Sequence, residues 1–326
     1  MSETRHANVQ GRESASGSGV RPAWAAIGVL VLVLQAWVYS AWIFSGDADR
    51  VDGGPDPVPT STTVTLTVVQ IVCVLLLAVV LGRYLISPWR REATISVEGT
   101  FVLAWATIYF HDPIINFSRV RVLYNAGAVN LGSWGSHIPG WHSPHGERLP
   151  EPLLIFLPAY AGVCFLLSLL GARMIRVIRA RRSGVPFVVV AGLIWLAQCV
   201  LNLVIETAWM KSELWVYPGA IPDLSVFAGT RSQFPIYESL FFGALVALMS
   251  VLLHLEQERA DRPRGPEVRR HALVAVLALI GLANVGALVL YDLPNQVIAY
   301  HEAPYPAHLP SYQRTGLCDP GPTDLC

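Results

Sequence analysis

Two apolar segments of the chain carry polar side chains at helical spacing. The first stripe consists of Trp105, Tyr109, Asp112 and Asn116, and the second of Trp195, Gln198, Asn202 and Glu206. Side chains three or four residues apart lie on one face of a helix, so each stripe presents its polar groups together. A carboxyl group in apolar surroundings holds its proton more tightly than in water, and a second, ionised carboxylate completes an acid and base pair. The pattern therefore favours proton-transfer chemistry.

Two later apolar segments carry further candidates near one end. Tyr237 and Glu238 lie in the first turn after Pro235, and Tyr291 and Asn295 share a helical face in the last segment. An acidic side chain at a helix N-terminus is stabilised by the helix dipole even without a further role. The two stripes could likewise be interfacial caps or hydrogen-bond networks between helices, since polar groups rarely face lipid. Capping and network formation stay open beside catalysis.

The elements that hold these residues are predicted to cross a membrane. Hydrophobic residues make up 53% of the 326 residues and charged residues only 14%, whereas soluble domains are about a quarter charged. A bilayer requires about 20 apolar residues per helix. Runs near that length occur at 22–44, 62–86, 95–110, 152–172, 186–209, 235–254 and 271–293. We therefore expect an all-α integral membrane protein, a bundle of about seven transmembrane helices.

The distribution of cations predicts the orientation of this bundle. Sixteen of the 23 lysines and arginines lie in the N-terminal tail and in alternate connections, and the others are spread over longer segments. The positive-inside rule then makes the N-terminus cytoplasmic and the C-terminus extracytoplasmic. Arginine is common and Lys211 is the sole lysine, which favours a bacterial cytoplasmic membrane. The predicted divisions are a disordered cytoplasmic tail at 1–21, the bundle at 22–293 with a functional loop at 111–151, and an extracytoplasmic segment at 294–326.

Other reactive residues give weaker signals. His137, His142 and His145 share one loop, but their spacing matches no standard zinc motif, so we expect no bound metal. The sequence has no phosphate-binding loop or nucleotide fingerprint, and we expect no cofactor. Its net charge is zero, which predicts no nucleic-acid partner. Cys318 and Cys326 enclose a short polar loop, and a disulfide between them depends on the compartment that they face.

Short motifs between the third and fourth apolar segments resemble one known family. They are His111-Asp112-Pro113, Asn116-Phe117, Tyr124-Asn125, Asn130-Leu131-Gly132-Ser133-Trp134-Gly135 and Pro139-Gly140-Trp141. Together with the multi-span layout and the chain length, these motifs are similar to the AveC-like spirocyclases of macrolide biosynthesis. The resemblance implies an enzyme that closes a dihydroxy-ketone polyketide chain into a spiroketal, in some members with a further loss of water.

Spiroketal closure gives the polar residues definite roles. The reaction protonates a carbonyl or hemiketal hydroxyl, expels water to leave an oxocarbenium ion, and delivers a second hydroxyl to that ion. We predict Asp112 and Glu206 as the acid and base pair, with Glu238 as the next candidate, and aromatic faces would favour the cation. The predicted substrate contacts are His111, Asn116, Tyr109, Tyr124, Asn125, Trp134, Trp141, Trp195, Gln198, Asn202, Tyr237, Tyr291 and Asn295. The expected partners are a lipophilic small molecule and the lipid bilayer.

Three other functions fit parts of the sequence. A terpene cyclase-like isomerase would use the same two carboxyl groups on a hydrocarbon substrate. A small transporter should have polar groups near the middle of the membrane and a path to both sides, whereas the cytoplasmic halves of the predicted helices are almost wholly apolar. A non-catalytic binding protein would tolerate Asp112→Asn and Glu206→Gln.

Overall fold

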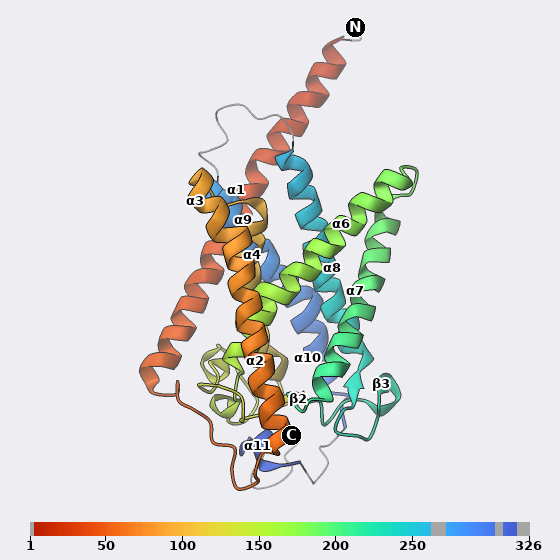
Figure 1. Cartoon of the computed structure of the whole chain (residues 1–326). Helices are drawn as coiled ribbons and strands as arrows, with labels where there is room; N and C mark the ends of the chain where they lie inside the picture. The colour runs from red at the N-terminus through yellow and green to blue at the C-terminus, as the bar shows by residue number, and fades with distance from the viewer. Residues whose placement is uncertain (1–2, 262–271, 304–308, 318–326) are drawn as a thin grey trace.

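The fold is a bundle of long helices that connecting segments cover at one end (Figure 1). The computed structural model describes residues 3–261, 272–303 and 309–317, so Cys318 and Cys326 lie outside the described residues. The longer helices are α1 (Glu3–Ser45), α2 (Thr60–Val80), α4 (Val97–Ile108), α6 (Phe165–Arg181), α7 (Phe187–Met210), α8 (Ile236–Ala260) and α9 (Ala272–Ala287). The shorter ones are α3 (Ser87–Glu92), α5 (Leu153–Pro158), α10 (Leu293–Ala299) and α11 (Ser311–Arg314).

Several helices join into longer runs through π-helical turns. These turns are η1 (Leu81–Ile86) between α2 and α3, η5 (Ala159–Cys164) between α5 and α6, and η8 (Leu288–Asp292) between α9 and α10. Six runs in the described residues are long and apolar enough to cross a membrane: Arg21–Ser45, Thr60–Glu92, Leu153–Arg181, Phe187–Met210, Ile236–Ala260 and Leu273–Ala299. The chain is thus a multi-pass membrane protein, and six of the seven apolar segments form long helices.

The third apolar segment differs from the expectation of a full span. α4 ends at Ile108 after 12 residues, and the chain continues as the 3₁₀ helix η2 (Tyr109–Asn116), which contains Pro113. Proline removes a backbone donor and clashes with the preceding α-helical turn, so the α-helix stops before it. Phe101 and Trp105 of α4 are buried, and the Trp105 indole donates to Ser168 Oγ of α6 at 3.0 Å. Because other helices surround α4 in place of lipid, α4 does not need the length that is required to span the hydrocarbon core of a bilayer.

The first helix is longer than its apolar run. α1 begins at Glu3, within the 1–21 segment that the sequence predicts to be disordered. Adding residues to an existing helix gains one hydrogen bond for each residue and avoids the unfavourable nucleation step, which accounts for this extension. From residue 21 onward, about half of the large apolar side chains of α1 are exposed, as suits a surface that meets lipid.

Two glycines allow α1 to lie directly against α9. A Cβ atom on Gly28 would stand 2.0 Å from the carbonyl oxygen of Leu277, and one on Gly281 would stand 2.4 Å from the carbonyl oxygen of Trp24. Real Cβ contacts are never that short, so the two backbones touch at a spacing that only glycine permits. Close approach of small residues is the usual way in which helices associate inside membranes.

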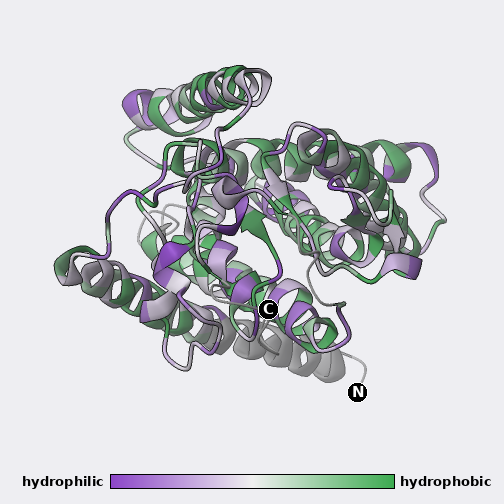
Figure 2. Ribbon diagram, turned by 90° about the horizontal axis from the view of Figure 1, so that it is seen from below, coloured by the Kyte–Doolittle hydropathy of each residue, from purple (hydrophilic) through white to green (hydrophobic). Residues whose placement is uncertain are grey.

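Connecting segments form a folded cap over the lower end of the bundle in Figure 1. Its short strands pair antiparallel, β1 (Leu123–Tyr124) with β2 (Trp215–Val216) and β3 (Ser225–Val226) with β4 (Phe234–Pro235). A buried ion pair of 2.7 Å joins Arg121 Nη2 to Glu302 Oε1, and the Tyr237 hydroxyl donates to the same oxygen at 2.7 Å. Seen from this end, the hydrophilic residues gather in the connections, and the helices behind them are mostly hydrophobic (Figure 2).

Candidate active site

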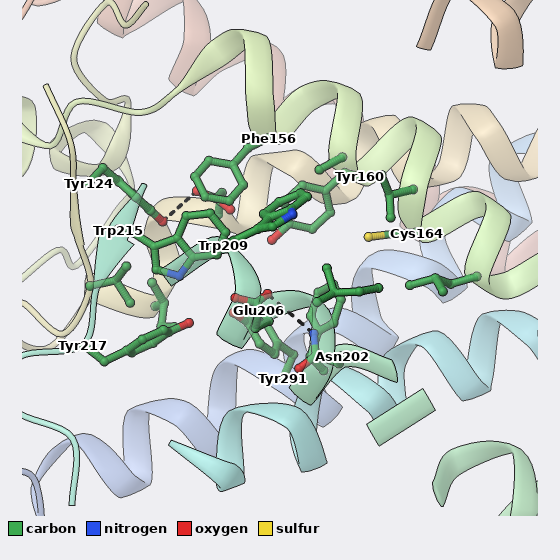
Figure 3. A pocket seen from close by; sticks show the side chains of 18 residues that line it. Tyr124, Phe156, Tyr160, Cys164, Asn202, Glu206, Trp209, Trp215, Tyr217 and Tyr291 are labelled. Atoms are coloured by element: carbon green, nitrogen blue, oxygen red, sulfur yellow. Dashed lines mark hydrogen bonds between the residues drawn. The ribbon is translucent and has the colours of Figure 1, made fainter. Parts of the chain in front are cut away.

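A cavity lies under the cap, between η5 on one side and the C-terminal half of α7 on the other (Figure 3). Its empty space amounts to about 660 Å³, part of which is open to the surroundings. The lining residues are Asp112, Ile115, Val122, Tyr124, Phe156, Ala159, Tyr160, Val163, Cys164, Leu167, Asn202, Ile205, Glu206, Trp209, Trp215, Tyr217, Phe242 and Tyr291. A largely apolar wall with a few converging polar groups is typical of a small-molecule site.

Asp112 enters this cavity from η2, where hydroxyl groups hold its carboxyl. Tyr124 donates its hydroxyl to Asp112 Oδ2 at 2.8 Å, and the Tyr160 hydroxyl also lies within hydrogen-bond reach. The β1 and β2 strands fix the backbone of Tyr124 opposite Trp215. Asp112 is therefore buried and oriented, and it still faces the cavity.

A second carboxyl group, that of Glu151, lies beside Asp112. Glu151 is fully buried just before α5 and its carboxyl lies close to that of Asp112, while neither of its oxygens accepts a hydrogen bond from a donor in the described residues. Burial, assisted by the neighbouring charge of Asp112, raises the pKa of Glu151 well above its ordinary value. Burial also raises the pKa of Asp112, although hydrogen bonds from Glu151 and Tyr124 oppose this effect. Two adjacent buried carboxyl groups resist ionising together unless a positive charge lies beside them, so the pair holds a proton near neutral pH, and Glu151 is its preferred site.

Glu206 faces the same cavity from α7. Its Oε1 accepts a hydrogen bond from Asn202 Nδ2 at 3.5 Å, while its buried Oε2 has no hydrogen-bond partner in the described residues. Ser239 of α8 donates to Asn202 Oδ1 at 2.9 Å, which turns the amide nitrogen of Asn202 toward Glu206. One carboxylate oxygen of Glu206 is thus oriented and the other is free to take a proton (Figure 3).

Aromatic rings form much of the wall between the two carboxyl sites. The ring centroids of Trp215 lie 5.4 Å from Trp209 and 5.1 Å from Phe156, and those of Phe242 and Tyr291 are 5.4 Å apart. The electron-rich faces of such rings attract positive charge, most strongly where water is excluded. The cavity therefore suits a reaction that passes through a cation.

Asp112, Glu206, Tyr124, Asn202 and Tyr291 are the predicted site residues that line the cavity. Glu238, the third predicted carboxyl, is buried but does not line it, and it lies within hydrogen-bond reach of Tyr291 and close to Asn295. Asn295 in turn accepts a hydrogen bond from Arg121 Nη1 at 2.9 Å. Glu238 and Asn295 therefore adjoin the ion-paired network of Arg121 that fastens the cap, as does Tyr237.

His111 points away from the cavity into the bundle. Its Nδ1 lies 2.5 Å from Asp292 Oδ2 and its Nε2 lies 3.0 Å from Asn284 Oδ1. The Nδ2 atom of Asn284 donates to the carbonyl oxygen of Ile280, so the amide cannot be turned the other way round. The Nε2 atom therefore donates to Asn284, and a proton is shared between Nδ1 and the buried Asp292 carboxyl.

Other predicted substrate contacts hold the cap in shape instead of lining the cavity. Asn116 accepts hydrogen bonds from the backbone N–H groups of Arg121 and Val122. Asn125 donates to the backbone carbonyl of Glu213. The indole of Trp134 donates to the carbonyl of Phe110, and that of Trp141 to the carbonyl of Ser143. Backbone groups that lack a strand or helix partner need such side chains when they are buried. The motifs that carry the family resemblance are therefore largely the scaffold of the cap.

Three further predicted contacts, on α7 and η2, also lie outside the cavity. Gln198 donates to the carbonyl of Leu167 at 2.9 Å and joins α7 to α6. Trp195 donates to the carbonyl of Leu240 and is 42% exposed on the outer surface of the bundle. The Tyr109 ring lies against Trp134 and Tyr160, behind the lining residues.

The three loop histidines make separate contacts. His137 Nε2 pairs with Asp47 Oδ2 at 2.9 Å, His142 lies against the ring of Phe117, and His145 lies 3.5 Å from Glu147. Within the described ranges, no group of three or more His, Cys, Asp or Glu side chains is placed to hold a metal ion.

Several residues of the site escape a sequence-based search. Glu151 stands alone between two prolines with no periodic partner, and Tyr160, Tyr217 and Trp215 belong to segments that look like ordinary core or loop. The one available signal for Glu151 is an acidic side chain directly before an apolar span, where the helix dipole also favours it. Its pairing with Asp112 depends on the folded cap.

The comparisons with known proteins agree with the motifs in the cap. A family model described as "Spirocyclase AveC-like" matches residues 89–314, which is well over half of the chain. No curated protein and no solved structure matches the chain.

Proposed function

Because the chain belongs to the AveC-like spirocyclase family, which points to a cyclase role in polyketide biosynthesis, we propose that it closes a lipophilic polyketide-type chain into a spiroketal by acid catalysis. The reaction takes place in the cavity under the cap, with loss of one water. Asp112 acts as the acid by passing on the proton that it shares with Glu151, and Glu206 acts as the base.

The observation that carries this proposal is the presence of two carboxyl sites on one cavity with different hydrogen-bond partners. Asp112 adjoins a second buried carboxyl, whereas Glu206 has one oxygen bonded to Asn202 and one free. A protonated carboxyl pair and a separate carboxyl group with one unpaired oxygen provide the two proton-transfer groups that acid and base catalysis requires.

The first step removes water from a hemiketal, which one substrate hydroxyl forms by adding to the ketone. Asp112 donates the shared proton to the hemiketal hydroxyl, the bond from carbon to that oxygen breaks, and water leaves with the electron pair. The remaining proton-free carboxyl pair and the faces of Trp209 and Trp215 stabilise the oxocarbenium ion.

The second step forms the new ring. The other substrate hydroxyl attacks the oxocarbenium carbon, a carbon–oxygen bond forms, and the hydroxyl proton passes to the free oxygen of Glu206. A water molecule then carries this proton back to the pair formed by Asp112 and Glu151, so the net reaction is hemiketal to spiroketal plus water. The aromatic walls hold the chain folded, which brings the hydroxyl close to the cation.

The experiment is to incubate the purified full-length protein in detergent with a linear dihydroxy-ketone and follow the loss of one water by mass spectrometry. General acid and base groups contribute about 10²- to 10⁴-fold each, so Asp112→Asn and Glu206→Gln should lower kcat by at least about 100-fold. Glu147→Gln is the matched control, because Glu147 is a half-exposed acid of the same cap.

Two results would contradict the proposal. If both carboxylate variants keep the activity of the Glu147→Gln control, the cavity does not perform the chemistry. If the protein leaves the dihydroxy-ketone unchanged but rearranges an isoprenoid polyene, the site is that of a terpene cyclase-like isomerase instead.

A further inference from the structure

A second cavity lies toward the opposite, arginine-rich end of the bundle. η1 and α3 form one side of it, and the start of α4, the middle of α6 and the end of α8 form the rest. Its empty space is about 670 Å³, and it is half open. We call it the arginine pocket, after Arg83, Arg173 and Arg176 in its lining.

The arginine pocket has an excess of positive charge. Three arginines and one acid, Glu98, line it, and none of these arginines has an ion-pair partner among the residues that the structure describes. The Arg83 guanidinium lies 5.5 Å from the ring centroid of Tyr84, which leaves its N–H groups available. Guanidinium groups bind phosphate oxygens with paired hydrogen bonds, so three of them in one hollow favour a phosphate group.

Two hydrogen-bond acceptors stand beside these cations. Gln257 Nε2 donates to Glu98 Oε1 at 2.6 Å, and this leaves Gln257 Oε1 buried without a donor in the described residues. An unpaired buried acceptor is costly, and a ligand that brings hydroxyl groups removes that cost. The lining therefore fits a ligand in which a phosphate is joined to a hydroxyl-bearing group.

The surroundings fit a lipid as the carrier of that group. Trp89 of α3 is 59% exposed near the pocket, and tryptophan favours the membrane interface. Ile86 and Leu170, on elements that build the pocket, and Val79, in the turn of α2 just before η1, are also exposed, as expected where acyl chains run. Basic pockets between membrane helices are a known means of binding anionic headgroups.

We propose that the arginine pocket binds the headgroup of an anionic phospholipid, with the phosphodiester against Arg83, Arg173 and Arg176 and headgroup hydroxyls donating to Glu98 and Gln257. The glycerol headgroup of phosphatidylglycerol has both features. This site is separate from the cavity under the cap and does not depend on the function proposed for that cavity.

The test measures lipid retention by native mass spectrometry of the delipidated full-length protein, incubated with phosphatidylglycerol, phosphatidylcholine or inorganic phosphate. Wild type should retain phosphatidylglycerol in preference to phosphatidylcholine, and inorganic phosphate should not displace it. The double variant Arg173→Gln with Arg176→Gln should bind phosphatidylglycerol about tenfold or more weakly, because each cation near a membrane surface contributes to anionic lipid binding. Arg181→Gln with Arg182→Gln removes the same charge from the same helix outside the pocket, and it should bind like wild type.

Equal losses in the two double variants would overturn the proposal, because they would indicate general surface attraction. Displacement by inorganic phosphate alone would also overturn it, since the site would then hold a free anion. Should the pocket variant fail to fold, the exposed Arg83→Gln variant tests the same claim with the same readout. Glu98→Gln should reduce the preference for phosphatidylglycerol over phosphatidic acid, which has no headgroup hydroxyl donor of this kind, and an unchanged preference would contradict the role of Glu98.

Discussion

The carboxyl group of Glu151 lies within hydrogen-bond reach of that of Asp112, and Glu151 itself is fully buried. Tyr124 and Tyr160 surround Asp112 from the cavity side with hydroxyl donors. These hydroxyls favour the ionised form of Asp112, and burial away from water favours the protonated form of Glu151. The proton of the pair is therefore held next to the residue that meets the substrate.

Glu151→Gln should lower kcat by at least about tenfold, because the amide can donate to Asp112 but cannot supply a proton. The acid proton would then have to reside on Asp112 alone, beside a permanent amide donor that favours the ionised carboxylate, so the remaining activity should shift toward lower pH. The measurement is the pH dependence of cyclisation of a dihydroxy-ketone. An unchanged pH profile together with unchanged kcat would show that Glu151 has only a structural role.

Tyr124→Phe removes the 2.8 Å hydrogen bond to Asp112 and leaves the ring in the wall. A hydrogen bond to a charged group contributes about 1.5–3 kcal/mol, so the ionised state of Asp112 should become harder to reach after proton donation. We expect kcat to fall about tenfold or more while KM changes little. A rise in KM with unchanged kcat would instead make Tyr124 a substrate contact.

The stability of the protein should depend on pH through Glu151. Below the ordinary value of 4.5, the group is protonated in both the folded and the unfolded chain and adds no penalty. Above it, the unfolded chain releases the proton while the folded chain retains it, so stability falls as pH rises toward the higher pKa of the folded state. Thermal unfolding in detergent gives the Tm of each protein. The Tm of Glu151→Gln minus that of wild type should be larger at pH 8 than at pH 5. The Glu147→Gln control should show no such trend, and equal pH dependence in wild type and Glu151→Gln would contradict the pKa shift.

Gly281→Ala should destabilise the bundle by about 1–3 kcal/mol, the usual cost of forcing extra atoms into a packed contact. Its new Cβ would stand 2.4 Å from the carbonyl oxygen of Trp24, so α1 and α9 would have to separate. Gly192→Ala is the matched control, since Gly192 lies in α7 with open space around its Cβ position, and alanine favours helix there. Equal Tm values for the two variants would show that α1 and α9 do not depend on this contact.

The long helices could be predicted from hydropathy because lipid imposes a minimum length on every span that it surrounds. The same rule fails for α4, since helices around it replace the lipid and Pro113 stops its α-helical turns early. The orientation with a cytoplasmic N-terminus stays a prediction that rests on the arginines.

The polar stripe of α7 was informative in only one half of the helix. Asn202 and Glu206 face the cavity, whereas Gln198 and Trp195 lie where α6 and α8 close against α7, and they bond to backbone carbonyls there. Helical spacing tells which residues share a face, but the neighbours of that face change along its length. Glu151 could not be predicted as part of the site, because it lies 39 residues after Asp112 in the chain and only the folding of the cap brings the two side chains together.

The most direct measurement is an experimental structure of the protein with a stable spiroketal product bound. The spiro carbon should lie between Asp112 and Glu206, with one ketal oxygen within hydrogen-bond distance of each carboxyl and the rings against Trp209 and Trp215. A product bound elsewhere, with water filling the cavity between the two carboxyl groups, would contradict the proposed catalytic site.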